Sequence, residues 1–247
     1  ALFGNAASVL VGDFLYSRAF QMMVSVGSMR IQQVLADATN TIAEGEVLQL
    51  LNCHNADVDV PQYLRVIRYK TAKLFEAAMR LGAILSGAPA DIEEGLARYG
   101  MHLGTAFQLV DDVLDYSGDE AATGKHLGDD LAEGKPTLPL IHAMKHGSAE
   151  HASCVRHAIE AGGRDALPGV LAAIRASGAL DETRRQAEAE ARLALDSIAL
   201  RRCTPCEHTG RKPNAQVRGE LAALYARQAE LERESQVQSQ VGRVDDA

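Results

Sequence analysis

The chain has 247 residues, of which 47% are hydrophobic and only 4% aromatic, and its formal net charge at pH 7 is −8. This acidic balance argues against nucleic acid as a partner, because phosphate backbones call for a clustered basic surface. Alanine and leucine dominate, and the scattered β-branched and aromatic residues do not alternate. We therefore expect an all-α fold with one buried core.

No apolar run approaches the roughly 20 residues that a helix needs to cross a bilayer. Asn5 and Asp13 interrupt the most apolar opening stretch, and no charged-then-apolar leader is visible. We expect a cytoplasmic protein that does not span a membrane. The sequence opens without Met, inside an apolar helical pattern that lacks a capping residue, so we also expect a piece of a longer protein.

Four long helices are expected in the first half of the chain, at residues 4–26, 28–52, 62–86 and 91–116. The first is apolar nearly all round, which is typical of a helix that is buried or lies at a subunit interface. A polar loop precedes the third helix. Before the fourth, Pro89 ends the helical pattern in a turn.

The stretch from Ser117 to Pro139 is the least regular internal part of the chain and is rich in Gly, Asp and Lys. Shorter helices are expected after it, at 139–146, 149–161, 165–177 and 179–200. The remaining residues are rich in Arg, Gln and Glu and have a thin apolar face. We see no repeat and no interdomain linker, which indicates one domain with a tail.

The four cysteines are too few for a disulfide framework in a chain of this length. Cys203 and Cys206 form a CxxC pair, with His208 just beyond. A structural zinc site requires four ligands, and no second pair lies nearby. Incidental thiols are therefore favoured over a metal or redox role.

Three carboxylates share one face of the fourth expected helix. Asp111 and Asp115 are four residues apart, and Asp112 and Asp115 are three apart. Their apolar neighbours indicate a helix that is at least half buried, where repulsion among the carboxylates grows and a cation must offset it. A solvated acidic face is the weaker alternative, because Asp is a poor helix former. Mg²⁺ binds one or two carboxylates and completes its shell with water and substrate phosphate, so we predict a magnesium–diphosphate site here.

Lysines that could bind the phosphate lie elsewhere in the chain. Lys70 belongs to the third helix among several other basic residues, where a solvated face is the simpler interpretation if it is taken alone. Lys125 and Lys135 each follow a glycine in the irregular stretch, and Lys binds phosphate as a point charge. Each lysine is a weak signal by itself, but together with the Asp cluster they indicate a diphosphate site.

Over about residues 1–200 the chain resembles the trans-isoprenyl diphosphate synthases, and within them the bacterial octaprenyl (polyprenyl) type. The motifs that carry the resemblance are Gly4-Asn5 with Val11 to Leu15, Glu44 to Leu50, Lys70 to Ala72, Gln108 to Asp115, Gly124-Lys125, and Gly128 to Pro139. The resemblance implies a single-domain helical bundle with a central apolar cavity for the growing chain. It covers a domain over residues 1–202 and leaves a divergent or partly disordered tail over 203–247.

The resemblance also implies a role for each site residue. Asp111, Asp112 and Asp115 look like the second of the family's Asp-rich motifs, which holds Mg²⁺ against the allylic diphosphate. Thr71 and Gln108 resemble the groups whose oxygens face the allylic carbocation, and Lys135 and Asp129 lie in a loop expected to close over the site. The expected catalytic residues are Lys70, Thr71, Gln108, Asp111 and Asp112. The expected substrate-binding residues are Lys70, Thr71, Gln108, Lys125 and Lys135.

The implied reaction joins an allylic prenyl diphosphate to isopentenyl diphosphate in successive trans additions. An octaprenyl product for a quinone side chain is the expectation that the resemblance supports. Diphosphate leaves only if metal and lysines absorb its developing charge, and the cation survives only if water is kept out. The resemblance implies a homodimer through residues 4–52, as the all-round apolarity of the first helix allows.

The family's pattern is incomplete in this sequence, because no second Asp-rich cluster is present. The first motif is expected upstream of Ala1, so the 247 residues alone are predicted to be inactive or nearly so. Two alternatives stay open. A class I terpene cyclase would show an Asn/Ser/Glu metal motif and more aromatic lining. A non-catalytic subunit of a heteromeric synthase would not be expected to keep the Asp cluster together with Lys70 and Lys125.

Overall fold

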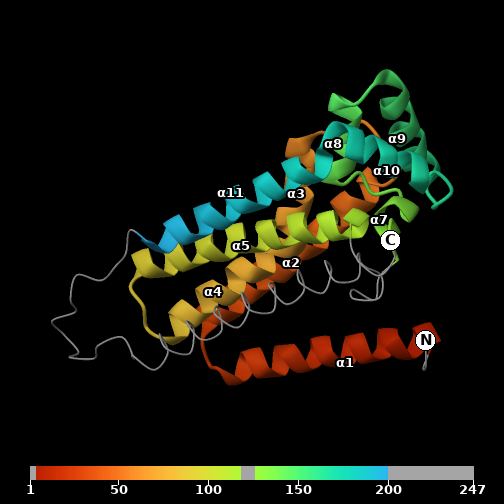
Figure 1. Ribbon diagram of the computed structural model, residues 1–247. Helices are drawn as coiled ribbons and strands as arrows, with labels where there is room; N and C mark the ends of the chain where they lie inside the picture. Colours follow the sequence, from red (N-terminus) through yellow and green to blue (C-terminus); the bar gives the residue numbers. More distant parts are fainter. Residues whose placement is uncertain (1–3, 118–125, 200–247) are drawn as a thin grey trace, which may run out of the picture. The chain divides into compact units, whose positions relative to one another are not determined.

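The computed structural model describes residues 4–117 and 126–199, which all lie in one compact unit, Ala1–Arg201. Among these residues there is no β-strand, which confirms the all-α prediction. The helices, labelled as in Figure 1, are α1 (Gly4–Ser25), α2 (Met29–Asn52), α3 (Val60–Ile67), the π-helical turn η1 (Arg68–Ala72), α4 (Lys73–Leu85), α5 (Ala90–Ser117), α7 (Asp129–Ala132), α8 (Leu138–His146), α9 (Ala149–Ala161), α10 (Leu167–Ser177) and α11 (Ala179–Ala199). Lys125 and the CxxC pair lie outside the described residues.

Local sequence signals explain where α2 and α3 begin. The Ser28 hydroxyl accepts a hydrogen bond from the backbone N–H of Ile31 and caps α2. At the start of α3, Asp59 and Gln62 form a reciprocal capping box, with N···O distances of 2.8 and 2.9 Å, and Pro61 occupies the first turn. These caps fix the residues at which α2 and α3 begin.

The helix expected over residues 62–86 is interrupted by η1. Two glycines allow neighbouring helices to touch the backbone of this turn. A Cβ added to Gly45 of α2 would lie 2.6 Å from the backbone nitrogen of Lys70, and a Cβ added to Gly104 of α5 would lie 2.6 Å from the Cα of Ala72. The π-turn is therefore held between α2 and α5 by contacts that no other residue type at these two positions could make.

The long helix α5 is the central element of the packing. It runs beside α11 on one side and beside α4 on the other (Figure 1). One core cluster joins α8, α9 and α10 to Tyr116 and Leu131. A second includes Tyr63, Ile67, Leu109 and Leu138, and so joins α3 to α5 and α8.

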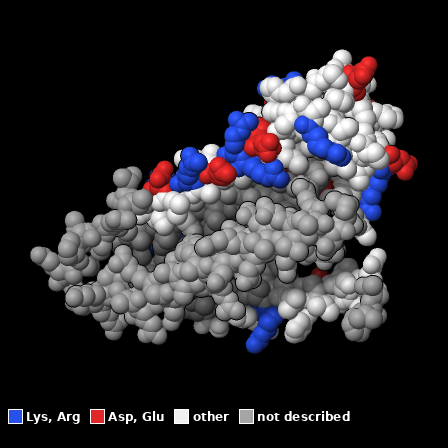
Figure 2. Space-filling model, in the orientation of Figure 1, with Lys and Arg blue, Asp and Glu red and all other residues white. Residues whose placement is uncertain are grey.

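The outer face of α11 carries ion pairs between residues three and four apart. Arg184 pairs with Asp181, Arg185 with Glu182, and Arg192 with Glu188. Figure 2 shows acidic and basic side chains interspersed along the edge of the molecule where α11 runs. Such exposed pairs contribute little stability each, so α11 is held mainly by its other face, which packs on α5.

Helix α1 differs from the rest because none of its residues is buried within this chain. Its exposed apolar side chains include Val9, Leu10, Phe14 and Leu15. Contacts within the chain therefore do not bury the helix expected over residues 4–26. In the part of the chain that the structure describes, no helix combines the length and apolarity required to cross a bilayer.

Candidate active site

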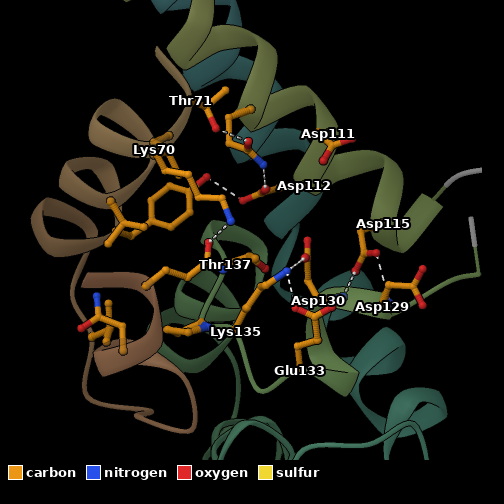
Figure 3. Close-up of a pocket in the computed structure, with 18 residues that line it drawn as sticks. Lys70, Thr71, Asp111, Asp112, Asp115, Asp129, Asp130, Glu133, Lys135 and Thr137 are labelled. Carbon is orange, nitrogen blue, oxygen red and sulfur yellow. Dashed lines mark hydrogen bonds and ion pairs between the residues drawn. The ribbon is translucent and has the colours of Figure 1, made fainter. Parts of the chain in front are cut away.

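A cavity of about 370 Å³ lies between α3 and η1 on one side and α5 and α7 on the other. Most of the side chains that line it are polar, as Figure 3 shows. All of the predicted site residues that the structure describes meet there: Lys70, Thr71, Gln108, Asp111, Asp112, Asp115 and Lys135. They come from three separate regions of the sequence, so the fold assembles the set that the sequence suggested.

The three carboxylates of α5 have different surroundings. Asp112 is 1% exposed and accepts hydrogen bonds from the Tyr63 hydroxyl at 2.6 Å and from the Gln108 amide at 3.0 Å. The two oxygens of Asp115 accept from the backbone N–H groups of Asp129 at 3.1 Å and Asp130 at 3.3 Å. Asp115 therefore caps the start of α7. Asp111 is half-buried and lines the cavity.

Burial perturbs the two inner carboxylates. The pKa of Asp112 is raised to about 7, chiefly by burial, with the nearby charges of Asp130 and Asp111 adding to the effect and the Tyr63 hydrogen bond opposing it. The pKa of Asp115 is also raised to about 7, by burial and then by the charge of Asp130. Within residues 4–117 and 126–199 no Lys or Arg forms an ion pair with either carboxylate. A bound cation would reverse these shifts, because an opposite charge favours the ionised form.

The donor set fits a hard divalent cation that shares its shell with a ligand. In the described ranges, no group of three or more His, Cys, Asp or Glu side chains is arranged to hold a metal ion by itself. Mg²⁺ does not require such a cage, because it is typically bound by one or two carboxylates together with phosphate oxygens and water. Asp111 and Asp112, with lysines in the same cavity, suit that mode.

A hydrogen-bond chain connects η1, α5 and α3. The Thr71 hydroxyl donates to the Gln108 carbonyl oxygen at 3.0 Å, and the Gln108 amide donates to Asp112. Because the hydrogen of Thr71 is directed toward Gln108, its oxygen lone pairs are left for the cavity. Sequence reasoning missed Tyr63, which completes the chain, because an aromatic residue on the apolar face of an amphipathic helix looks like ordinary core.

Two lysines supply positive charge to the same cavity (Figure 3). Lys70 Nζ lies 3.0 Å from Glu46 and 3.2 Å from the Gln49 carbonyl oxygen. Lys135 Nζ lies 3.1 Å from Asp130 and 2.6 Å from Glu133. Burial opposes ionisation of Lys135, but the hydrogen bond to Glu133 and the charge of Asp130 raise its pKa above the ordinary value. Lys135 is therefore positively charged at neutral pH. An anionic ligand in the cavity would replace some of the present partners of the two lysines.

Gly134 and His54 set the position of Lys135. Gly134 has a positive φ of 66°, which only glycine adopts without strain, and its carbonyl accepts a hydrogen bond from the backbone N–H of His54 at 2.8 Å. Nearby, Asp129 pairs with Arg164 at the start of the segment leading to α10. The turn that carries Lys135 is therefore tied to two other parts of the chain.

Comparison with known proteins shows which family the chain is similar to. Residues 1–174 match the family model described as polyprenyl synthetase. The octaprenyl diphosphate synthase of Escherichia coli K12 is 55% identical over 206 residues, covering 83% of this chain and 64% of the relative. The nonaprenyl diphosphate synthase of Rhodobacter capsulatus is 44% identical over 200 residues, covering 81% of this chain and 61% of the relative.

Solved structures agree. A polyprenyl synthase from Caulobacter crescentus, in complex with calcium and isoprenyl diphosphate, superposes with a TM-score of 0.76 at 43% identity, covering 81% of this chain and 61% of that one. A decaprenyl diphosphate synthase from Rhodobacter capsulatus gives a TM-score of 0.73 at 44% identity, covering 80% and 62%. The chain thus spans roughly three-fifths of the length of the relatives that it matches. The extent of the family match and the identity to these synthases show that the chain belongs to the polyprenyl synthetase family.

Proposed function

We propose that the protein is a trans-polyprenyl diphosphate synthase, which condenses an allylic prenyl diphosphate with isopentenyl diphosphate. The observation that carries the proposal is the meeting of Asp111 and Asp112 with Lys70 and Lys135 around one cavity, in a chain of a prenyltransferase family. A family member complexed with calcium and isoprenyl diphosphate supports it further.

In this reaction the allylic carbon–oxygen bond breaks and its electron pair leaves with the diphosphate. Lys70 and Lys135 bind that anion and stabilise its growing charge, and Lys125 stays a predicted third cation. Asp111 and Asp112, with Asp115 beside them, would hold Mg²⁺, which when bound neutralises the diphosphate as a Lewis acid. The double bond of isopentenyl diphosphate then attacks the cation, and loss of a proton restores a double bond.

The neighbouring side chains suit a short-lived carbocation. Thr71 donates its hydrogen to Gln108, so the lone pairs of the Thr71 oxygen are available to the cation. Tyr63 donates to Asp112, so its hydroxyl hydrogen is not presented to the cation either. Fixed oxygen dipoles that are already oriented cost no reorganisation when charge develops.

The growing chain requires an apolar path away from the diphosphate. On α5, Phe107, Val110 and Leu114 form an apolar stripe, spaced three and four residues apart, that is exposed within this chain. Phe107 lies one turn before Asp111, and its ring lies 5.5 Å from that of Phe75 on α4. These side chains are our candidates for one wall of the apolar cavity that the prenyl tail would occupy.

The proposed enzyme is a homodimer whose interface is formed by residues 4–52. Its helical domain covers residues 1–202, and it acts in the cytoplasm. The dimer is supported by the exposed apolar side chains of α1 and by Val47, Leu50 and Leu51 at the end of α2. Light scattering after size exclusion would report twice the monomer mass. A strictly monomeric protein at micromolar concentration would contradict this part of the proposal.

Turnover tests the proposal directly. The 247-residue protein and a longer form extended upstream should be incubated with farnesyl and isopentenyl diphosphates and Mg²⁺, and the product chain length measured. We expect long-chain products, with eight isoprene units as the prediction, from the longer form and little or no turnover by the 247 residues alone. A cyclised hydrocarbon as product would overturn the proposal, and full turnover by the shorter form would contradict the expectation about its activity.

A further inference from the structure

Glu190 of α11 is more buried than the acidic residues that form ion pairs along the outer face of that helix. Its side chain is 12% exposed, whereas that of Glu188, two residues earlier, is 66% exposed. One oxygen of Glu190 lies 3.0 Å from Arg68 Nη2 and the other lies 2.6 Å from His102 Nδ1. An ionised carboxylate only accepts hydrogen bonds. The Glu190 carboxylate therefore accepts one from Arg68 of η1 and one from His102 of α5.

Arg68 is the first residue of η1, and Lys70 and Thr71 are its third and fourth. A π-turn has poorer hydrogen-bond geometry than an α-helix and occurs mostly as a single turn, often at functional sites. Its shape therefore depends on what surrounds it. The backbone contacts to Gly45 and Gly104 hold two of its sides, and the ion pair with Glu190 attaches its first residue to α11.

We propose that Glu190 is a positioning residue, which fixes η1 through Arg68 and so directs Lys70 and Thr71 into the cavity. Glu190 does not line the cavity, and its role rests on the proposed function of those two residues. Because Arg68 is 41% exposed, water can solvate it when Glu190 is removed. Loss of Glu190 should therefore loosen the turn more than it destabilises the fold.

Two measurements on the 247-residue protein test the proposal. The first is hydrogen–deuterium exchange of the peptide that spans residues 68–72, in Glu190→Ala and in the matched control Glu188→Ala, which removes an exposed carboxylate from the same helix. We expect faster exchange of this peptide in Glu190→Ala only. Unchanged exchange would overturn the proposal, and this measurement does not depend on any bound ligand.

The second measurement is calorimetric binding of inorganic pyrophosphate in the presence of Mg²⁺. A lost contact between a charged group and the ligand weakens binding by about tenfold or more, so we expect that loss in Glu190→Ala and in Arg68→Ala. Arg68→Lys, which keeps the charge, should recover much of the affinity. The stoichiometry reports the folded fraction separately from the dissociation constant. Faster exchange with an unchanged dissociation constant would reduce Glu190 to a structural role and overturn the proposal.

The double variant gives a sharper criterion. If Glu190 acts through Arg68, the two alanine substitutions together weaken binding no more than either one alone, whereas additive losses would show two independent effects and contradict the proposal. Failure of the wild-type protein to bind pyrophosphate would instead count against the proposed function, and the exchange measurement would still decide whether Glu190 holds η1.

Discussion

The contact between Gly45 and the π-turn makes a substitution of one methyl group informative. In Gly45→Ala the new Cβ would lie 2.6 Å from the backbone nitrogen of Lys70 and 2.9 Å from its Cα. Both partners are backbone atoms, so no side chain can rotate away. Ordinary carbon contacts require about 3.5 Å or more, and α2 and η1 must therefore separate by roughly 1 Å.

The expected cost follows from two opposing effects. Overpacking of this kind typically destabilises a protein by about 1–3 kcal/mol, and alanine in a helix recovers about 0.5–1 kcal/mol relative to glycine. We therefore expect Gly45→Ala to lower the free energy of unfolding by about 1–2 kcal/mol. Displacing Lys70 by this much should also weaken Mg²⁺-dependent pyrophosphate binding by about tenfold or more.

Urea unfolding and calorimetric titration would measure the two effects. Gly82→Ala is the matched control, because Gly82 is in α4, next along the chain after η1, and a Cβ added there has nothing within 4 Å. That variant should be as stable as the wild type or more stable, by up to about 1 kcal/mol, and should bind pyrophosphate normally. The reasoning fails if Gly45→Ala is as stable as Gly82→Ala and binds pyrophosphate as tightly.

Other expectations follow from the carboxylates of α5. The pKa of Asp112 is raised to about 7, against 3.8 in the unfolded chain, so the native state binds more protons between these pH values. The free energy of unfolding should therefore fall as pH rises from about 4 to 7. Urea titrations should show a flatter pH dependence for Asp112→Asn. Asp115→Ala should lower the free energy of unfolding by about 1 kcal/mol, because it removes the α7 cap. The loss should appear as a lower Tm in the absence of pyrophosphate. Asp111→Asn should shift the urea midpoint less than Asp115→Ala but abolish Mg²⁺-dependent binding. Mg²⁺ and pyrophosphate together, at about 100 times the dissociation constant, should stabilise the fold by about 2.7 kcal/mol, measured as a rise in Tm that neither produces alone.

The helices were predictable because their signals are local. Apolar periodicity, Ser28 and Pro89 predicted α2 and the start of α5 to within one or two residues, and the spacing of the three Asp residues put them on one face. The membership of the family, which the motifs indicated, is confirmed. These features depend on residues that are close together in the sequence.

Features that depend on distant residues could not be predicted in the same way. Nothing in Arg68 to Ala72 distinguishes a π-turn from an α-helix, because the turn is fixed by glycines on two other helices. The Tyr63 partner of Asp112 is 49 residues away from it, and the Glu190 partner of Arg68 is 122 residues away. From their spacing alone the three Asp residues look equivalent. In the structure, however, Asp112 accepts hydrogen bonds from side chains, whereas Asp115 accepts them from backbone N–H groups.

The central claim is that the carboxylates of α5 and the lysines of the cavity bind magnesium and a prenyl diphosphate together. Calorimetric titration of farnesyl diphosphate into the 247-residue protein, with Mg²⁺ and then with a chelator, tests it most directly. We predict saturable binding with Mg²⁺ that is at least about tenfold weaker with the chelator and is lost in Asp111→Asn. Equal affinity under both conditions, or wild-type affinity in Asp111→Asn, would contradict the claim.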